Sequence, residues 1–203
     1  RIAAVVGNGQ RELLRAHLRD VDVAFVPEDR STEGLIPELS ITENLVLGLP
    51  DDPRWAGRLG VNWAAARARA AELLSSFDIQ ASGPDALVAT LSGGNQQKVV
   101  LARALEKGPR VLIAENPTRG LDVRATAEVH ARLRGAAIAG VAVVIHSTDL
   151  DEVLELSQQV LVVHAGRVQV APTGASRRQV GEMMLGVRGP SATGPTGPRA
   201  DTR

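Results

Sequence analysis

The sequence contains no cysteine and no tyrosine in its 203 residues, and aromatic residues make up only 2% of it. The lack of cysteine excludes disulfide bonds and thiolate metal sites, which suits a reducing compartment without requiring one. The chain also carries no net charge, because 23 basic side chains balance 23 acidic ones. This balance gives no indication of binding to nucleic acid or to an anionic membrane surface.

Long hydrophobic runs are missing as well. The longest apolar runs, such as residues 2–6 and 141–145 with five residues each, are far shorter than the roughly 20 apolar residues that cross a bilayer. We therefore expect no direct membrane insertion, so that contact with a membrane would go through another protein. The overall hydrophobic content of 44% is enough for the core of one ordinary domain.

The chain instead shows a regular alternation of short apolar runs and helix-like segments. Continuous apolar runs rich in β-branched residues are typical of strands in a sheet that is covered on both faces. Their alternation with helices predicts an α/β fold with a mainly parallel sheet. The expected strands are residues 2–6, 23–26, 111–114, 141–145 and 160–163.

Local signals mark where several helices begin and end. Ser40 and Glu43 have the spacing of a capping box, and Asn62 can cap the alanine-rich helix that follows it. Pro109 is expected to stop a helix that begins near Asn95.

The first expected strand leads into a glycine turn that opens a helix, which is the setting of a phosphate loop. The pattern GxxxxGK[ST], however, places Gln10 where a lysine would reach the phosphates and Arg11 where a hydroxyl would bind Mg²⁺. The loop Gly7, Asn8, Gly9, Gln10, Arg11 is therefore degenerate. Its backbone could still attract an anion, but we favour the alternative, a turn used for close packing.

The third expected strand ends in Glu115 and Asn116. In phosphate-loop ATPases the corresponding run ends in an aspartate that holds Mg²⁺, often followed by a glutamate that orients the attacking water. Asn116 cannot accept a proton, so general-base catalysis there is excluded. Glu115 could reach a metal through water, or both residues could simply end a core strand.

The fourth expected strand ends in a histidine that could contact a γ-phosphate. His146 lies two positions ahead of Thr148, where such a histidine is expected, and two residues along a strand are about 7 Å. We therefore favour a structural role for His146 and count Thr148 as a third degenerate position. Asp149 and Asp151 are expected to complement the dipole of the next helix.

The stretch LSGGNQQK predicts a second glycine turn that opens a helix. Ser92 offers a hydroxyl, Gly93 and Gly94 allow close approach of the backbone, and the helix N-terminus attracts anions. The same pattern also occurs at ordinary helix starts. No intact GxxxxGK[ST] accompanies it in this sequence, so the residues alone leave open which phosphate it would contact.

In combination these motifs resemble the nucleotide-binding domain of an ABC transporter. The resemblance runs from about residue 2 to 188 and is most specific in the middle. More narrowly, it is to the second, C-terminal cassette of the fused ATPases that drive sugar and nucleoside importers. The stretches that carry it are VPEDR at 26–30, ITENLVLG at 41–48, LSGGNQQK at 91–98, PTRGLDV at 117–123 and DLDEV at 149–153.

The resemblance implies a phosphate-loop NTPase-like fold over residues 1–188, with a helical subdomain at about 38–106 and a disordered tail at 189–203. In this family two cassettes pair head to tail, and each signature loop contacts ATP in the other cassette's phosphate loop. ATP and Mg²⁺ would then be bound mainly by the partner. The residues implied to contact that ATP are Leu91, Ser92, Gly93, Gly94, Asn95 and Gln96.

Two further positions correspond to functional residues of the family, but the match is less specific than that of the signature. Glu28 corresponds to a loop residue that senses Mg²⁺ and couples to the transmembrane partner, and Asp122 corresponds to an aspartate that crosses the dimer interface. The alternative is that both are ordinary solvated carboxylates in turns.

Two departures from the family weaken the expectation of independent ATP binding. The chain begins inside the expected first strand, so a hairpin that stacks adenine on an aromatic residue is expected to be absent. Only four residues separate Leu18 from the strand at Val23, so the antiparallel β subdomain is expected to be largely missing.

We therefore expect a cassette that donates its signature to a partner cassette with an intact phosphate loop, at the inner face of the cell membrane beside permease subunits. Hydrolysis by its own site is not expected. The main alternative is a non-catalytic remnant or pairing module without a role in transport. A chromosome-maintenance ATPase would need long coiled coils, which this chain lacks.

Overall fold

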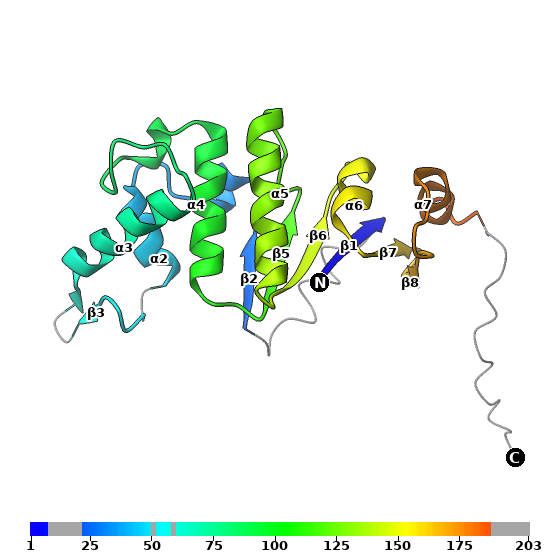
Figure 1. The fold of residues 1–203 in the computed structure, drawn as a ribbon, viewed down its shortest axis with the longest axis horizontal. Helices are drawn as coiled ribbons and strands as arrows, with labels where there is room; N and C mark the ends of the chain where they lie inside the picture. The colour runs from blue at the N-terminus through cyan, green and yellow to red at the C-terminus, as the bar shows by residue number, and fades with distance from the viewer. Residues whose placement is uncertain (8–21, 50–51, 58–59, 188–203) are drawn as a thin grey trace, which may run out of the picture.

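The computed structural model describes residues 1–7, 22–49, 52–57 and 60–187. Its centre is a sheet in the order β2-β5-β6-β1-β7-β8, and every neighbouring pair is parallel except β7 and β8 (Figure 1). All five strands predicted from the apolar runs are present, so the α/β fold is confirmed. The strands are β1 Ile2–Gly7, β2 Val23–Val26, β5 Val111–Glu115, β6 Ala142–His146, β7 Gln159–His164 and β8 Arg167–Val170.

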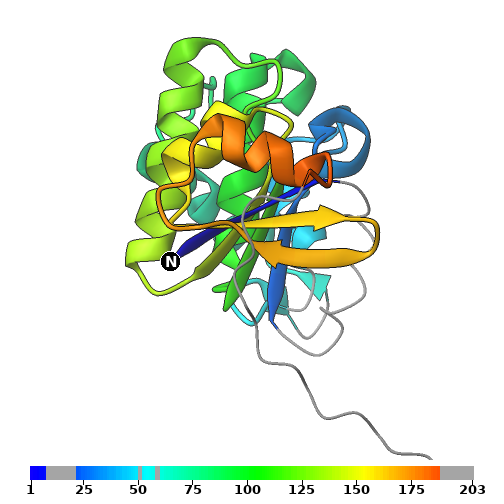
Figure 2. The ribbon, with the colours of Figure 1, turned by 90° about the vertical axis from the view of Figure 1, so that its right-hand side faces the viewer.

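Helices pack along the sheet and beyond its first edge. Helix α4 contacts β2 and α5 contacts β6, while α2 and α3 lie next to α4, away from the sheet (Figure 1). At the other end α7 packs on β7, and Figure 2 shows it lying across the β7–β8 hairpin. The helices are α2 Ile41–Gly48, α3 Trp63–Ser76, α4 Gly93–Glu106, α5 Val123–Ile138, α6 Leu150–Leu156 and α7 Arg177–Met184, with short helical turns η1 Arg30–Gly34 and η2 Val88–Thr90.

The helix ends follow the local signals, with one correction. The Ser40–Glu43 capping box and the Asn62 cap are both present. Helix α4, however, begins at Gly93 with Ser92 as its cap, two residues before the predicted start. The helix ends ahead of Pro109 as predicted.

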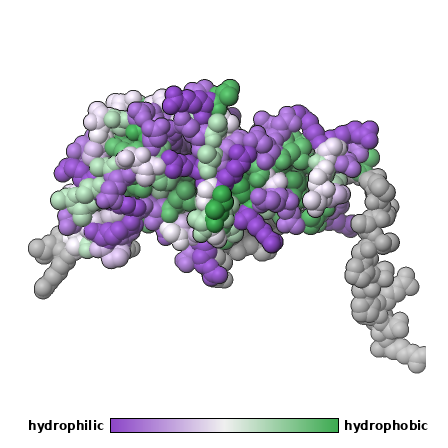
Figure 3. Space-filling model, viewed as in Figure 1, coloured by the Kyte–Doolittle hydropathy of each residue, from purple (hydrophilic) through white to green (hydrophobic). Residues whose placement is uncertain are grey.

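The core has two parts. The larger cluster fills the space between the sheet and α4 and α5 and continues into the helical region around Trp55, which is only 1% exposed. The smaller cluster joins β1 and β7 to α6 and α7. On the outer face shown in Figure 3, polar and apolar residues are interspersed.

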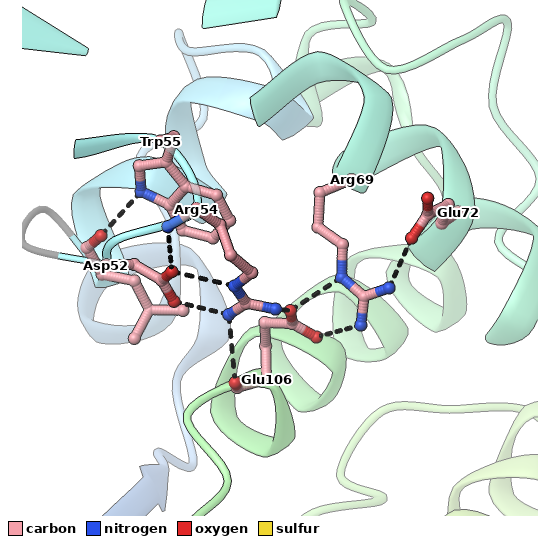
Figure 4. A network of polar contacts seen from close by, with 7 residues as sticks. Asp52, Arg54, Trp55, Arg69, Glu72 and Glu106 are labelled. Carbon is pink, nitrogen blue, oxygen red and sulfur yellow. Dashed lines mark hydrogen bonds and ion pairs between the residues drawn. The ribbon is translucent and has the colours of Figure 1, made fainter. Parts of the chain in front are cut away.

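An ion network joins the helical region to the end of α4 (Figure 4). The buried carboxylate of Glu106 accepts hydrogen bonds from Arg69 Nε at 2.7 Å and Nη2 at 2.8 Å. Arg54 bridges Glu106 and Asp52, and its Nε lies 2.8 Å from Asp52 Oδ1. The network therefore connects α3, and the segment that carries Asp52 and Arg54, to the C-terminus of α4.

A small two-stranded antiparallel sheet is present in addition to the main sheet, formed by β3 Ala56–Gly57 and β4 Gly60–Val61. The segment in which the antiparallel β subdomain was expected to be shortened, and the predicted tail at 189–203, lie outside the described residues. Within the described part of the chain, no helix is both long and apolar enough to span a membrane.

Candidate functional site

The signature stretch forms the exposed N-terminus of α4. Ser92 is the N-cap, and its Oγ accepts hydrogen bonds from Asn95 N at 3.4 Å and Asn95 Nδ2 at 3.1 Å. Ser92 is exposed, and Gly93 and Gly94 are partly exposed beside it. The first N–H groups of a helix have no carbonyl partner within the helix and lie at its positive end, so this terminus can attract an anion.

The two glycines allow close packing on both sides of this terminus. A Cβ atom on Gly93 would lie 2.6 Å from Nη2 of Arg30, and one on Gly94 would lie 2.9 Å from Cβ of Ala125 at the start of α5. A larger residue at Gly94 would therefore push α4 away from α5, whereas at Gly93 only the end of the flexible Arg30 side chain would have to move. A surface pocket of about 430 Å³ lies between the first turns of α4 and α5, with Ser92 in its lining.

The loop after β5 is tied to the loop after β6. Asn116 has a left-handed backbone with φ 41°, and its N–H donates to the carbonyl of His146 at 2.6 Å. Its side-chain Oδ1 accepts from Thr148 N at 2.8 Å and from Thr148 Oγ1 at 3.2 Å. The amide oxygen of Asn116 is therefore already engaged, and Glu115 beside it is fully buried.

The structure brings His146 and Thr148 to the same edge of the sheet. His146 is the last residue of β6, is 6% exposed, and lies between Val5 of β1 and Glu115 of β5 in the strand register. Thr148 is exposed in the loop beyond it. The predicted structural role of His146 accords with its burial but stays a prediction.

The remaining predicted positions are turn residues that make definite contacts. Glu28 forms an ion pair with Arg119. Asp122 is exposed and caps α5, because its Oδ1 accepts from Ala125 N at 2.8 Å. Asp149 likewise caps α6, since its side chain accepts from Asp151 N and Glu152 N.

Most of the predicted phosphate loop, residues 8–11, lies outside the described residues. Gly7 is described at the end of β1, where φ is 116° and an added Cβ would lie only 1.9 Å from the carbonyl oxygen of Val163. Close backbone approach therefore requires glycine at this position. That requirement supports the packing interpretation of Gly7 and is independent of phosphate.

Sequence reasoning missed a buried cluster around Glu152 of α6. Its Oε1 accepts from Thr118 Oγ1 at 2.7 Å and lies 3.0 Å from Nε2 of the buried His130. Burial alone would raise the pKa of Glu152, but hydrogen bonds from His130, Ser147 and Thr118 outweigh it and lower that pKa. The ionised carboxylate thus joins α5, α6 and the loop that carries Asp122.

The only signal of this cluster in the sequence is an acidic residue directly before the apolar Val153 of the DLDEV stretch. That signal says nothing about the partners of Glu152, which are 22 and 34 residues away. Among the described residues, no group of three or more histidine, aspartate or glutamate side chains is arranged to hold a metal.

Comparison with known proteins places these motifs in one family. Residues 7–119 match the model of the ABC transporter family. The nucleoside import ATP-binding protein NupA of Lactococcus lactis is 34% identical over 91% of this chain and 42% of its own length. The ribose import ATP-binding protein RbsA 2 of Streptomyces avermitilis is 47% identical over 72% of this chain and 28% of its own length.

The fold is also shared with solved structures. The ATP-binding cassette MJ0796, solved as a dimer in a post-hydrolysis state with ADP and Pi, superposes with a TM-score of 0.67 over 86% of both chains, at 22% identity. The chain spans less than half the length of the two curated relatives. It belongs to the ABC transporter family, as an ATP-binding cassette related to the ATP-binding proteins of nucleoside and sugar import.

Proposed function

We propose that this cassette acts in a sugar or nucleoside importer by donating its signature, Leu91–Gln96, to ATP held by a partner cassette. The observation that carries the proposal is the exposed N-terminus of α4, where Ser92 and two glycines present a hydroxyl and backbone N–H groups to solvent. An anion brought there from outside meets the positive end of a helix of 14 residues.

The cassette's own ATP site is proposed to be weak. Gln10 brings no charge to a phosphate, and Arg11 would repel Mg²⁺ where a hydroxyl is needed. Glu115 is buried, and the oxygen of Asn116 is occupied by Thr148. These features support an asymmetric pair in which the partner holds most of the ATP and Mg²⁺.

The partners follow from this arrangement. A second cassette with an intact phosphate loop would hold the nucleotide, and permease subunits would carry the substrate across the membrane. Sugar or nucleoside as the substrate class is supported by the names of the relatives and by the VPEDR and SGGNQQK stretches. The cassette would then lie at the inner face of the membrane through its contact with the permease.

The test is a substitution that blocks the signature without disturbing the fold. In a pair reconstituted with an intact cassette and its permease, Ser92→Arg should abolish ATP turnover, because its bulk and charge block the approach of the partner's phosphate. Ser75→Arg on the exposed side of α3 is the matched control and should leave turnover unchanged. Normal turnover with Ser92→Arg, in a chain with an unchanged circular dichroism spectrum, would refute the proposal.

A second candidate function is a pairing module that drives no transport. The observation that favours it is the loss of charge at Gln10 and of the general base at Asn116. The same reconstitution separates the two functions. A pair that assembles but turns over ATP no faster than the partner alone would support the pairing module.

A further inference from the structure

The turn made by VPEDR, residues 26–30, approaches the signature more closely than its place in the sequence suggests. We propose that Arg30 is a positioning residue of the composite ATP site, which holds the N-terminus of α4 and the loop before α5 in one fixed arrangement. The inference rests on the proposed function, since it concerns the same signature segment.

The turn that carries Arg30 is closed by its own hydrogen bonds. The carboxylate of Asp29 accepts from Ser31 N at 2.9 Å and from Thr32 N at 3.2 Å. The backbone carbonyl of Asp29 accepts from Glu33 N at 3.0 Å and Gly34 N at 3.2 Å. Four donors thus converge on one residue, so the direction in which the Arg30 side chain leaves the turn is well defined.

The same turn is held against α4. Arg103 of α4 donates to the carbonyl oxygen of Gly34, and a Cβ on Gly34 would lie 3.2 Å from Cγ2 of Val100. Gly34 itself is buried. The turn and α4 therefore form one packed unit, with Arg30 at the end nearest the signature.

The guanidinium of Arg30 lies between two segments that are far apart in the sequence. Its Nη1 donates to the carbonyl oxygen of Arg119 at 3.1 Å. Its Nη2 lies beside Gly93, where an added Cβ would come within 2.6 Å of it. The side chain of Arg119 returns to the VPEDR turn through its ion pair with Glu28. The turn is thus bonded to the loop before α5, and the guanidinium of Arg30 lies close beside the signature.

The charge of Arg30 argues against a purely structural role. A cation beside a helix N-terminus opposes the helix dipole and does not stabilise the helix. Its Nε is also buried, with no hydrogen-bond partner among the described residues, which is an unfavourable state for a charged donor. Both unfavourable features are explained by a role of Arg30 in preparing the signature for an anion that binds at Ser92.

Arginine is suited to this position in a way that lysine is not. The guanidinium is planar and has donors on separate edges, so it can contact Arg119 and Gly93 together. The ammonium of lysine is a single point charge and can reach only one of them. Arg30→Lys keeps the positive charge but removes the simultaneous contact with Arg119 and Gly93. Its effect therefore distinguishes a role of the charge from a role in positioning.

The test compares Arg30→Lys and Arg30→Gln in the reconstituted transporter, with Arg67→Gln as a control. Arg67 pairs with Asp85 on the surface, so its loss should leave turnover unchanged. We expect both Arg30 variants to lower kcat on the order of 10- to 100-fold, because a misplaced signature no longer fits the transition state. The KM for ATP should change much less, because the partner holds the nucleotide.

A second measurement uses the isolated chain and does not depend on transport. Hydrogen exchange at the hydrogen-bonded amides of Gln96, Arg119 and Leu121 should be faster in both Arg30 variants than in the unmodified chain, and unchanged in Arg67→Gln. Wild-type kcat in Arg30→Lys, or unchanged exchange at these amides, would overturn the inference.

Ser92→Arg, measured in parallel, separates failure of the inference from failure of the proposed function. If Ser92→Arg abolishes turnover and the Arg30 variants do not lower it, the inference alone is overturned. If Ser92→Arg leaves turnover unchanged, the proposed function fails, and the exchange rates of the isolated chain still decide whether Arg30 positions these segments.

Discussion

Replacing Thr118 by valine would remove one hydrogen bond to the buried carboxylate of Glu152 while keeping nearly the same side-chain shape. The bond is 2.7 Å long, and Glu152 is only 6% exposed. A hydrogen bond to a charged group contributes about 1.5 to 3 kcal/mol, compared with about 0.5 to 1.5 kcal/mol for a neutral pair. We expect Thr118→Val to lower the free energy of unfolding at neutral pH by about 1.5 to 3 kcal/mol.

The direction of the pKa shift of Glu152 determines how the effect of Thr118→Val on the free energy of unfolding changes with pH. The pKa of Glu152 is lowered in the folded state, where hydrogen bonds from His130, Ser147 and Thr118 outweigh burial. The stabilisation from its ionised form is therefore present above the pKa of the unfolded chain and is lost as pH falls through the folded pKa. The difference between Thr118→Val and the unmodified chain should shrink over that acidic range, because a protonated Glu152 accepts only a neutral hydrogen bond.

Urea unfolding at a series of pH values measures both effects. Thr90→Val is the matched control, since the hydroxyl of the exposed Thr90 donates to the neutral carbonyl of Leu87 at 2.7 Å. Its effect should stay within about 0.5 kcal/mol, as for most surface substitutions, and should not depend on pH. An equally small effect of Thr118→Val at neutral pH, or an effect that does not change towards acid, would refute the argument that Glu152 is ionised and held by these bonds.

Three further predictions follow from other contacts. Gly7→Ala should lower the free energy of unfolding by about 1 to 3 kcal/mol or prevent folding, because its Cβ would overlap the carbonyl oxygen of Val163; chemical unfolding measures this. Glu106→Gln should cost about 1 to 3 kcal/mol by weakening the bonds from Arg69 and Arg54, and high salt should reduce the difference because both arginines are partly exposed. The isolated chain should bind MgATP more weakly than micromolar in equilibrium dialysis; micromolar binding would contradict a weak site of its own.

The features of the site that the sequence predicts are those formed by residues adjacent in the sequence. Ser92, Gly93 and Gly94 are adjacent in sequence and form the start of α4, although the predicted start at Asn95 was two residues late. The two glycines predict a turn ahead of the helix, whereas Ser92 caps it and the glycines form its first turn. Asp149, predicted to complement the dipole of α6, also caps that helix through bonds to residues directly after it.

The unpredicted part of the site depends on pairs that are far apart in sequence. The sequence shows that Asn116 cannot act as a base, but the hydrogen bond that its Oδ1 accepts from Thr148 N exists only because β5 and β6 are neighbours in the sheet. Neither composition nor spacing could identify that neighbour.

The sequence by itself determined five of the six strands of the main sheet, several helix caps and the family, because each depends on apolar runs or motifs within a few adjacent residues. Only the tertiary structure decided that Arg30 lies against Gly93 and that Glu152 binds Thr118. Those contacts require the strand order β2-β5-β6-β1-β7-β8 and the packing of α4 beside α5. Burial of the whole core determines that arrangement, and no short stretch of the sequence contains it.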